Sequence, residues 1–355
     1  MSNLQQTIAQ GQPEKVPLGV VQHNLSDIRP ISSEIAHLWS TYLAESMAIC
    51  MLKHMVAKSK DPDIHNFLQW SLDISSQRVQ SMEDIFNSIQ HPIPYGFGEE
   101  DVDIDAEELF HETFSLRYTR LMTRFMMKNN SVALSDSARI DFRNYFSQAI
   151  KTSIEKMNGA TDLLLAKGLF NKTPEIPIPD KVEYVNDNKY YGAFFGRSDR
   201  SLNVMEINNI YSLMDFKLSL KTMMLGFAQV IKSEKIRDYL NKGLHMVDKQ
   251  LETLQSFLEN ENLPTPKDTD FLVTESKESP YSDRLMLLHV TLTKAYLISS
   301  YGLALTDTAR KDLVLSFSRS MAEIMEYTKE GIDLLIENKW LERAPEAANR
   351  QELTH

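Results

Sequence analysis

The chain contains 355 residues, of which 42% are hydrophobic and 25% are charged. These proportions are typical of a globular protein with a sizeable core, and they exclude a disordered chain. The 38 Lys and Arg residues stand against 49 Asp and Glu residues, which gives a formal net charge of −11. We therefore expect neither nucleic acid nor an anionic membrane as a partner.

A single cysteine, Cys50, excludes an intrachain disulfide and any Cys-based zinc or iron–sulfur site. The first residues are polar and lack the apolar segment of a signal peptide, which favours a cytoplasmic location. The most membrane-like stretch, residues 285–306, carries His289 and Lys294 at its centre. We expect it to be a buried helix of a bundle, with no transmembrane segment in the chain.

The chain contains one unit twice. Residues 34–40 align with 206–212 at an offset of 172, and Leu-Ser-Asp-Ser-Ala-Arg at 134–139 aligns with Leu-Thr-Asp-Thr-Ala-Arg at 305–310 at an offset of 171. A register that persists over this length predicts two homologous domains. We expect an N-terminal arm (1–31), a first four-helix bundle (32–170), a linker strap rich in Pro and aromatic residues (171–203), a second four-helix bundle (204–343) and a C-terminal tail (344–355).

Apolar residues recur with helical spacing in four segments of each unit. In the first unit they predict helices over 32–60 and 61–90, a third helix capped by Asp105 with Glu108 in capping-box spacing, and a fourth from Ser135 to 168. Long helices with one apolar face pack as four-helix bundles, and a long link after the second helix permits the crossover of a ferritin-like topology. The sequence thus predicts an all-α fold of two tandem four-helix bundles.

Three features together resemble a known family: the tandem bundles, a Pro-x-Pro after each second helix (92–94 and 264–266), and the paired motif that ends in Ala-Arg. They are similar to the domain-of-unknown-function family 3231, whose members are found mainly in spore-forming Gram-positive bacteria. The resemblance covers almost the entire chain. It implies two ferritin-like bundles and an association with sporulating cells. It implies no established activity and no catalytic residue.

A ferritin-like fold raises the question of a di-iron site, which needs inward carboxylates from all four helices and two Glu-x-x-His pairs. The helical phase places Glu155 toward solvent, and the second unit has Lys217 where the first has Glu45. We therefore expect no di-metal site, no metal and no cofactor. The candidates in the first unit, one for each helix, are Glu45, Glu83, Glu108 with His111, and Glu155.

Two weaker patterns involve the same region. Glu107 and His111 are four residues apart and could hold one metal with a third ligand, although a plain side-chain pair is the favoured interpretation. A second pattern has the spacing of a calcium loop, but Ala106 stands where the turn requires Gly, so we do not expect calcium. Its acidic residues are Asp101, Asp103, Asp105 and Glu112.

The sequence contains no motif of a catalytic nucleophile or a phosphate-binding loop. Cys50 lies on an apolar helix face, which predicts a buried, inert thiol. His289 lies on an apolar stripe opposite Tyr118 of the first unit, and we expect it to be a hydrogen-bonded core residue.

The linker contains four aromatic residues that could mediate docking: Tyr190, Tyr191, Phe194 and Phe195. Left exposed, they would favour association with another surface. The favoured interpretation is a strap packed across one or both bundles. The alternative is a segment that docks a partner or closes over a ligand.

Three functional hypotheses follow. The leading one is a non-enzymatic protein that acts through interaction or assembly, with an unknown protein partner or with itself. The second is a ferritin-like metal-dependent oxidoreductase or iron-handling protein. The third is a binder of apolar small molecules in the bundle interior. Stoichiometric bound metal would single out the second, and a co-purified apolar ligand the third.

Overall fold

The computed structural model describes residue 25 and residues 28–193 and 200–347. Within these residues the chain forms eight α-helices and no β-strand. The first unit contains α2 (Ser32–Lys58), α3 (Pro62–Ser88), α4 (Glu112–Ser135) and α5 (Ile140–Ala166). The second unit contains α6 (Val204–Val230), α7 (Glu234–Glu259), α8 (Asp283–Asp307) and α9 (Lys311–Glu337). Three short 3-10 helices are η1 (Glu99–Asp101), η2 (Asn188–Tyr191) and η3 (Asp270–Leu272).

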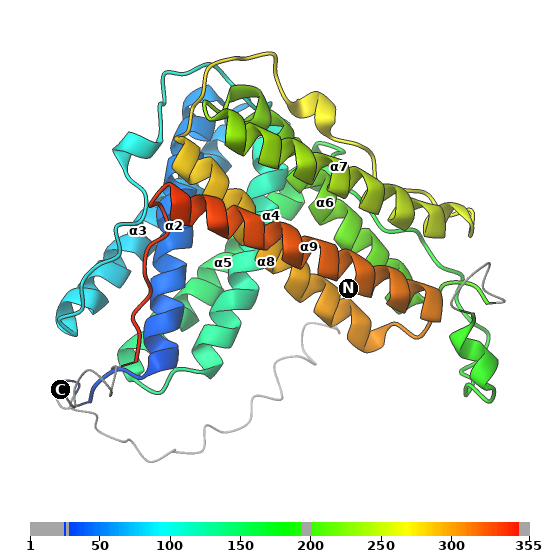
Figure 1. Ribbon diagram of the computed structural model, residues 1–355. Helices are drawn as coiled ribbons and strands as arrows, with labels where there is room; N and C mark the ends of the chain where they lie inside the picture. Colours follow the sequence, from blue (N-terminus) through cyan, green and yellow to red (C-terminus); the bar gives the residue numbers. More distant parts are fainter. Residues whose placement is uncertain (1–24, 26–27, 194–199, 348–355) are drawn as a thin grey trace, which may run out of the picture.

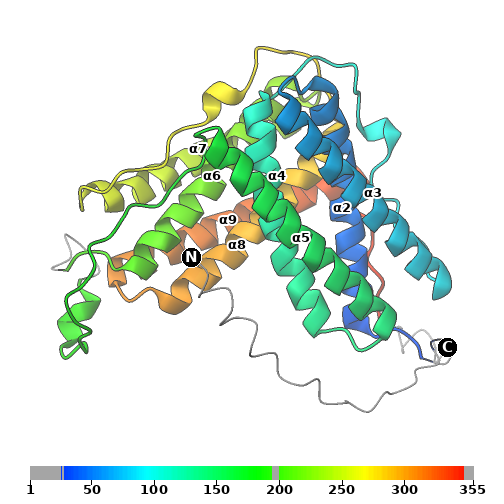
Figure 2. The ribbon, with the colours of Figure 1, turned by 180° about the vertical axis from the view of Figure 1, so that it is seen from behind.

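Each unit is a four-helix bundle, which confirms the predicted all-α tandem fold. In the first unit α2 packs on α3 and α4 on α5, with further contacts between α2 and α4 and between α3 and α5. The second unit repeats these four contacts with α6 to α9. The two bundles form two arms that meet where α4 and α8 lie (Figures 1 and 2).

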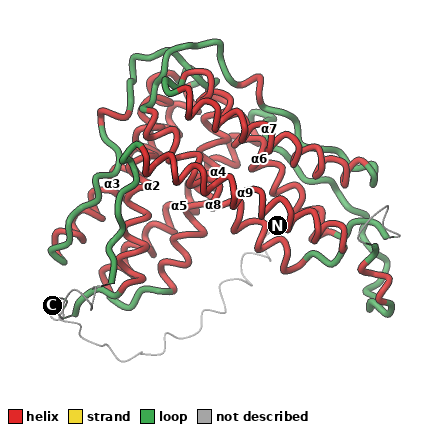
Figure 3. Tube along the Cα trace, in the orientation of Figure 1, coloured by secondary structure: helices red, strands yellow, loops and turns green. Residues whose placement is uncertain are grey.

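A long connection joins the second and third helices of each unit. Residues 89–111 and 260–282 run as loops along the outer edges of the two arms and meet at the apex (Figure 3). Their length is the one expected for a crossover. The ferritin-like topology itself stays a prediction.

The first two helices of the first unit end within two residues of the predicted positions. The predicted starts of the third and fourth helices are wrong. The third helix, α4, begins at Glu112 and not near Asp105. The fourth, α5, begins at Ile140, and Ser135 is the last residue of α4.

A distant glutamate explains the start of α5. The buried carboxylate of Glu34 on α2 accepts hydrogen bonds from the backbone N–H groups of Ala138 (2.9 Å) and Arg139 (2.8 Å). In the second unit Glu206 accepts from the N–H groups of Ala309 (3.2 Å) and Arg310 (3.0 Å). The repeated Ala-Arg therefore marks a helix start whose free N–H groups are capped from another helix.

The late start of α4 has a different cause. The residues before it are extended because they pair with the connection of the second unit, through isolated bridges between Val102 and Tyr281 and between Phe110 and Val273. At the internal offset of 171, Val102 corresponds to Val273 and Phe110 to Tyr281. The two bridges are therefore equivalent.

The backbone hydrogen bonds around the bridges obey the same relation. The N–H of Asp103 donates to Pro280 O at 2.9 Å, and the corresponding N–H of Thr274 donates to Leu109 O at 3.0 Å. The pair His111 N to Leu272 O (2.8 Å) likewise matches Ser282 N to Asp101 O (3.1 Å). The two units thus meet as the subunits of an isologous dimer do, although they belong to one chain.

The stretch 285–306, which is the most apolar in the sequence, lies within α8 at the junction. Lys294 and His289 are buried there, with exposed fractions of 0% and 3%. This confirms the predicted bundle helix. Among the described residues, no helix has the length and apolar character needed to cross a membrane.

Candidate functional site

The centre of the first bundle contains charged side chains. Glu45 is 2% exposed, and its carboxylate accepts a hydrogen bond from Arg78 Nη1 at 2.6 Å. Lys156 is buried in the same region, and burial lowers its pKa to about 8. Glu45 therefore has a cationic partner at the place where a di-metal site would need its carboxylate.

The other predicted metal candidates lie apart from Glu45. Glu83 accepts from the Tyr42 hydroxyl at 3.0 Å, and Glu155 is exposed, as its helical phase predicted. Glu108 forms an ion pair with Lys60 at 3.1 Å. In the ranges that the structure describes, no group of three or more His, Cys, Asp and Glu side chains is arranged to hold a metal.

The helical pairing of Glu107 with His111 is wrong. Glu107 precedes α4 and lies in the extended segment, where its N–H donates to Glu278 at 2.8 Å. His111 is the N-cap of α4, and its Nδ1 accepts from the N–H of Thr113 at 3.1 Å. Because the segment is not helical, the two side chains do not share a helix face.

The acidic residues of the calcium-like pattern are used elsewhere. Asp101 is buried and pairs with Arg284 of the second unit at 2.7 Å. Glu112 accepts from the N–H groups of Lys60 (2.7 Å) and Asp61 (2.8 Å). Asp105 is exposed and caps no helix, which corrects its predicted role. Cys50 is buried as predicted, and burial raises its pKa to about 12.

The second bundle has two lysines at its centre. Lys217 and Lys294 are both fully buried. Lys217 donates to Gln250 Oε1 at 2.5 Å, and burial lowers its pKa to about 7. Lys294 lies 3.4 Å from Met224 Sδ, and burial followed by repulsion from Lys217 lowers its pKa well below its usual range. One pattern in the sequence could have indicated this centre: Lys217 and Lys294 each lie within a strongly apolar helix, α6 and α8.

The linker residues are only partly described. Tyr190 is half-buried, with the Arg200 guanidinium 4.1 Å from its ring centre and a hydrogen bond from Asn203 Nδ2 to its hydroxyl at 3.0 Å. Tyr191 is 47% exposed. Phe194 and Phe195 lie outside the described residues. The docking of this segment on the bundles stays a prediction.

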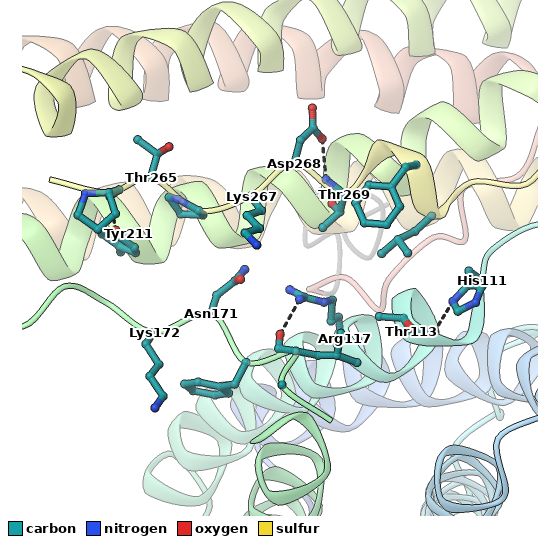
Figure 4. A pocket seen from close by; sticks show the side chains of 17 residues that line it. His111, Thr113, Arg117, Asn171, Lys172, Tyr211, Thr265, Lys267, Asp268 and Thr269 are labelled. Atoms are coloured by element: carbon teal, nitrogen blue, oxygen red, sulfur yellow. Dashed lines mark hydrogen bonds between the residues drawn. The ribbon is translucent and has the colours of Figure 1, made fainter. Parts of the chain in front are cut away.

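A cleft of about 600 Å³ lies at the junction of the two bundles. One wall is the segment that follows α5, residues 168–172, and the other is the connection of the second unit, residues 264–272. Thr113 and Arg117 of α4 line it between these walls (Figure 4). Sequence reasoning missed the cleft, because it noted these segments only as a helix end and as a Pro-x-Pro stop.

The cleft carries positive charge. Arg117 donates to Leu169 O, and its buried Nε has no hydrogen-bond partner within the described chain. Lys267 reaches into the cleft from the opposite wall, while Lys172 points away from it (Figure 4). The nearby Asp268 lies 3.6 Å from Lys221, which also pairs with Asp270 at 2.7 Å. Burial lowers the pKa of Arg117, and the Asp215 carboxylate on α6 partly offsets this, so the cationic side chain that enters the cleft without an acidic partner in the described residues is Lys267.

The cleft also has apolar surface. Phe170 and Tyr211 line it together with Pro264 and Pro266 of the opposite wall. A concave site with mostly apolar walls and a few polar groups is typical of sites for small organic ligands.

These features define a tandem all-α protein whose two bundles are joined as an internal dimer with a cleft at the junction. The chain belongs to the family described as protein of unknown function DUF3231, which matches residues 23–182 and 194–353. The solved structures include a Bacillus halodurans protein provisionally described as a spore coat protein. It is 12% identical with a TM-score of 0.40, over 42% of this chain and 98% of that chain. No curated protein matches the chain significantly.

Proposed function

We propose that the chain is a non-enzymatic binding protein, in which the fused bundles form a scaffold and the cleft at their junction holds a ligand. The observation that supports this most directly is that the cleft is open on one side of a junction built from equivalent parts. On the other side Glu342, after α9, accepts hydrogen bonds from the N–H groups of Tyr95 (3.0 Å) and Gly96 (2.8 Å). That contact joins the second unit's C-terminal segment to the first unit's connection.

The buried lysines favour binding over catalysis. Lysines with lowered pKa are candidates for catalytic groups, but only where a substrate can reach them. Lys217 and Lys294 are fully buried, and neither lines the cleft. Lys156 lines a pocket of only about 40 Å³ in the first bundle. That volume is also too small for an apolar organic ligand, so the proposed site is the cleft and not the centre of the first bundle.

The two sides of the junction provide a matched pair of variants. Lys267, directly after the second Pro-x-Pro, reaches into the cleft, and Tyr95, directly after the first Pro-x-Pro, is its equivalent in the first unit. Lys267→Trp should obstruct the cleft, whereas Tyr95→Trp alters the surface of the closed side. Tyr95 is 90% exposed, so the fold should tolerate the change.

The test is a screen of small organic fragments by ligand-observed NMR with the full chain and both variants. We expect fragments that bind the wild-type chain and Tyr95→Trp but not Lys267→Trp. Thermal unfolding should show that both variants fold. Equal binding to all three proteins would contradict the proposal. The association with sporulating cells implied by the family resemblance stays a separate prediction, which this experiment does not address.

A further inference from the structure

We infer that the cleft binds an organic acid, with the ligand carboxylate between the wall that carries Lys267 and the floor that carries Arg117. This inference rests on the proposed binding function and names the ligand class. It comes from comparing the open cleft with the closed side of the same junction.

The closed side shows which chemical group joins the two walls. Tyr95 and Gly96, whose N–H groups hold the Glu342 carboxylate, are the two residues directly after the first Pro-x-Pro. The residues directly after the second Pro-x-Pro are Lys267 and Asp268. On the closed side, the segment after the Pro-x-Pro therefore binds a carboxylate from the other unit.

On the open side the chain supplies no such carboxylate. At the internal offset of 171, Glu342 corresponds to Asn171, which lines the cleft. The Asn171 side chain is neutral, and its Nδ2 donates to Asp215 of α6 at 3.3 Å. The equivalent positions thus differ: Glu342 holds the two walls together through its carboxylate, whereas Asn171 carries a neutral amide that is already hydrogen-bonded.

The charges of the cleft fit an anion brought from outside. Within the described chain Lys267 has no ion-pair or hydrogen-bond partner, and the buried Nε of Arg117 has none either. Of the acids nearby, Asp215 acts electrostatically on Arg117, and Asp268 accepts from the N–H groups of Thr269 and Asp270, so neither forms an ion pair with Lys267. Asp268 points away from the cleft in Figure 4. A carboxylate that contacts a charged donor forms a stronger hydrogen bond than a neutral group does.

The remaining surface fits the body of the ligand. Phe170, Tyr211 and Pro266 provide apolar surface beside the cationic groups. A volume of about 600 Å³ lies in the range of sites that hold drug-sized molecules. The expected ligand is therefore an amphipathic organic acid, with an aromatic or aliphatic body and one carboxylate.

The experiment compares aryl-alkyl carboxylic acids with their primary amides by isothermal titration calorimetry on the full chain. Each acid and its amide have nearly the same shape, so a difference in affinity reports the charge. We expect the acids to bind about tenfold or more tightly than the amides. Lys267→Met should remove this preference. Lys172→Met, which deletes the same charge from a side chain that points away, should retain it.

The outcomes separate this inference from the proposed function. If amides bind as well as acids and Lys267→Trp abolishes the binding of both, the cleft binds ligands but the organic-acid assignment is wrong. If Lys172→Met weakens the acids as much as Lys267→Met, only the general charge of the surface matters, and the assignment is wrong as well. The titration is repeated with a capped peptide that contains one internal glutamate. Tighter binding of this peptide than of every acid would assign the carboxylate to a protein side chain and overturn the proposal.

Discussion

The hydroxyl of Tyr118 and Nε2 of His289 form a hydrogen bond across the junction of the two bundles, at 2.8 Å. At the internal offset of 171 the two residues are equivalents of each other, so this contact lies at the centre of the approximate two-fold relation. Both side chains are buried, at 5% and 3% exposed. The prediction that His289 is a hydrogen-bonded core residue is confirmed.

Removing the Tyr118 hydroxyl should destabilise the protein. In Tyr118→Phe the buried Nε2 of His289 loses its hydrogen-bond partner, and leaving a buried polar group unsatisfied costs about 1–3 kcal/mol. The free energy of unfolding in urea measures this loss. Tyr95→Phe is the control, because Tyr95 is 90% exposed, and it should leave the stability unchanged. Equal effects of the two changes would show that the junction hydrogen bond does not contribute.

His289 should make stability depend on pH. Burial lowers its pKa from 6.5 to about 3 in the folded protein. Below pH 6.5 the unfolded chain binds a proton that the folded chain does not, so stability is lost as the pH falls toward 3. Linkage gives a loss of about 2 kcal/mol between pH 7 and pH 5. His289→Phe should reduce the change in the free energy of unfolding between pH 7 and pH 5. Substitution of the exposed His245 by Gln should leave that pH dependence unchanged.

The buried ion pair of the first bundle should be costly to break from one side. Arg78→Met removes the ion-pair partner of the buried Glu45 carboxylate and leaves only Lys156 within electrostatic range, which costs about 3–5 kcal/mol. Thermal and urea unfolding measure it. The double variant Glu45→Met with Arg78→Met removes both charges and should recover most of the loss. If the double variant is no more stable than Arg78→Met alone, the loss comes from packing and not from the unpaired charge.

Lys217 should destabilise the folded chain at neutral pH and below. Its pKa falls from 10.5 to about 7 on folding. Between these values the unfolded chain binds the extra proton, so stability rises as the pH increases from 7 to 10.5. Lys217→Met should be more stable than the wild type at pH 6, and the difference should shrink by pH 10. Lys277→Met, at an exposed position, should change neither the stability at pH 6 nor its rise toward pH 10.

We also predict that the bundles do not hold a di-metal centre. Arg78 and Lys156 in the first bundle, and Lys217 and Lys294 in the second, place arginine and lysine side chains where divalent ions would need several carboxylates. Protein purified without chelator should contain much less than one iron or manganese per chain by elemental analysis. Two metals per chain, lost in Glu45→Gln, would contradict this prediction and support the oxidoreductase hypothesis.

The sequence by itself determined the two homologous units, their four helices each and the bundle helix over residues 285–306. These features follow from the spacing of apolar residues along the chain, which is a local property. Helix starts that depend on local caps were predicted only where the cap is local, as at Asp61, whose side chain accepts from the N–H groups of Asp63 and Ile64 at 3.0 and 3.2 Å.

The tertiary structure alone decided the start of α5, which is capped by Glu34 from about a hundred residues away, and the start of α4, whose preceding residues pair with the second unit. It also decided the cleft. Asn171 and Glu342 follow equivalent helices, but one binds its partner through an amide and the other through a carboxylate. Whether each side of the junction is closed depends on which groups of the two units meet there. Helical periodicity carries no information about contacts between segments so distant in the chain.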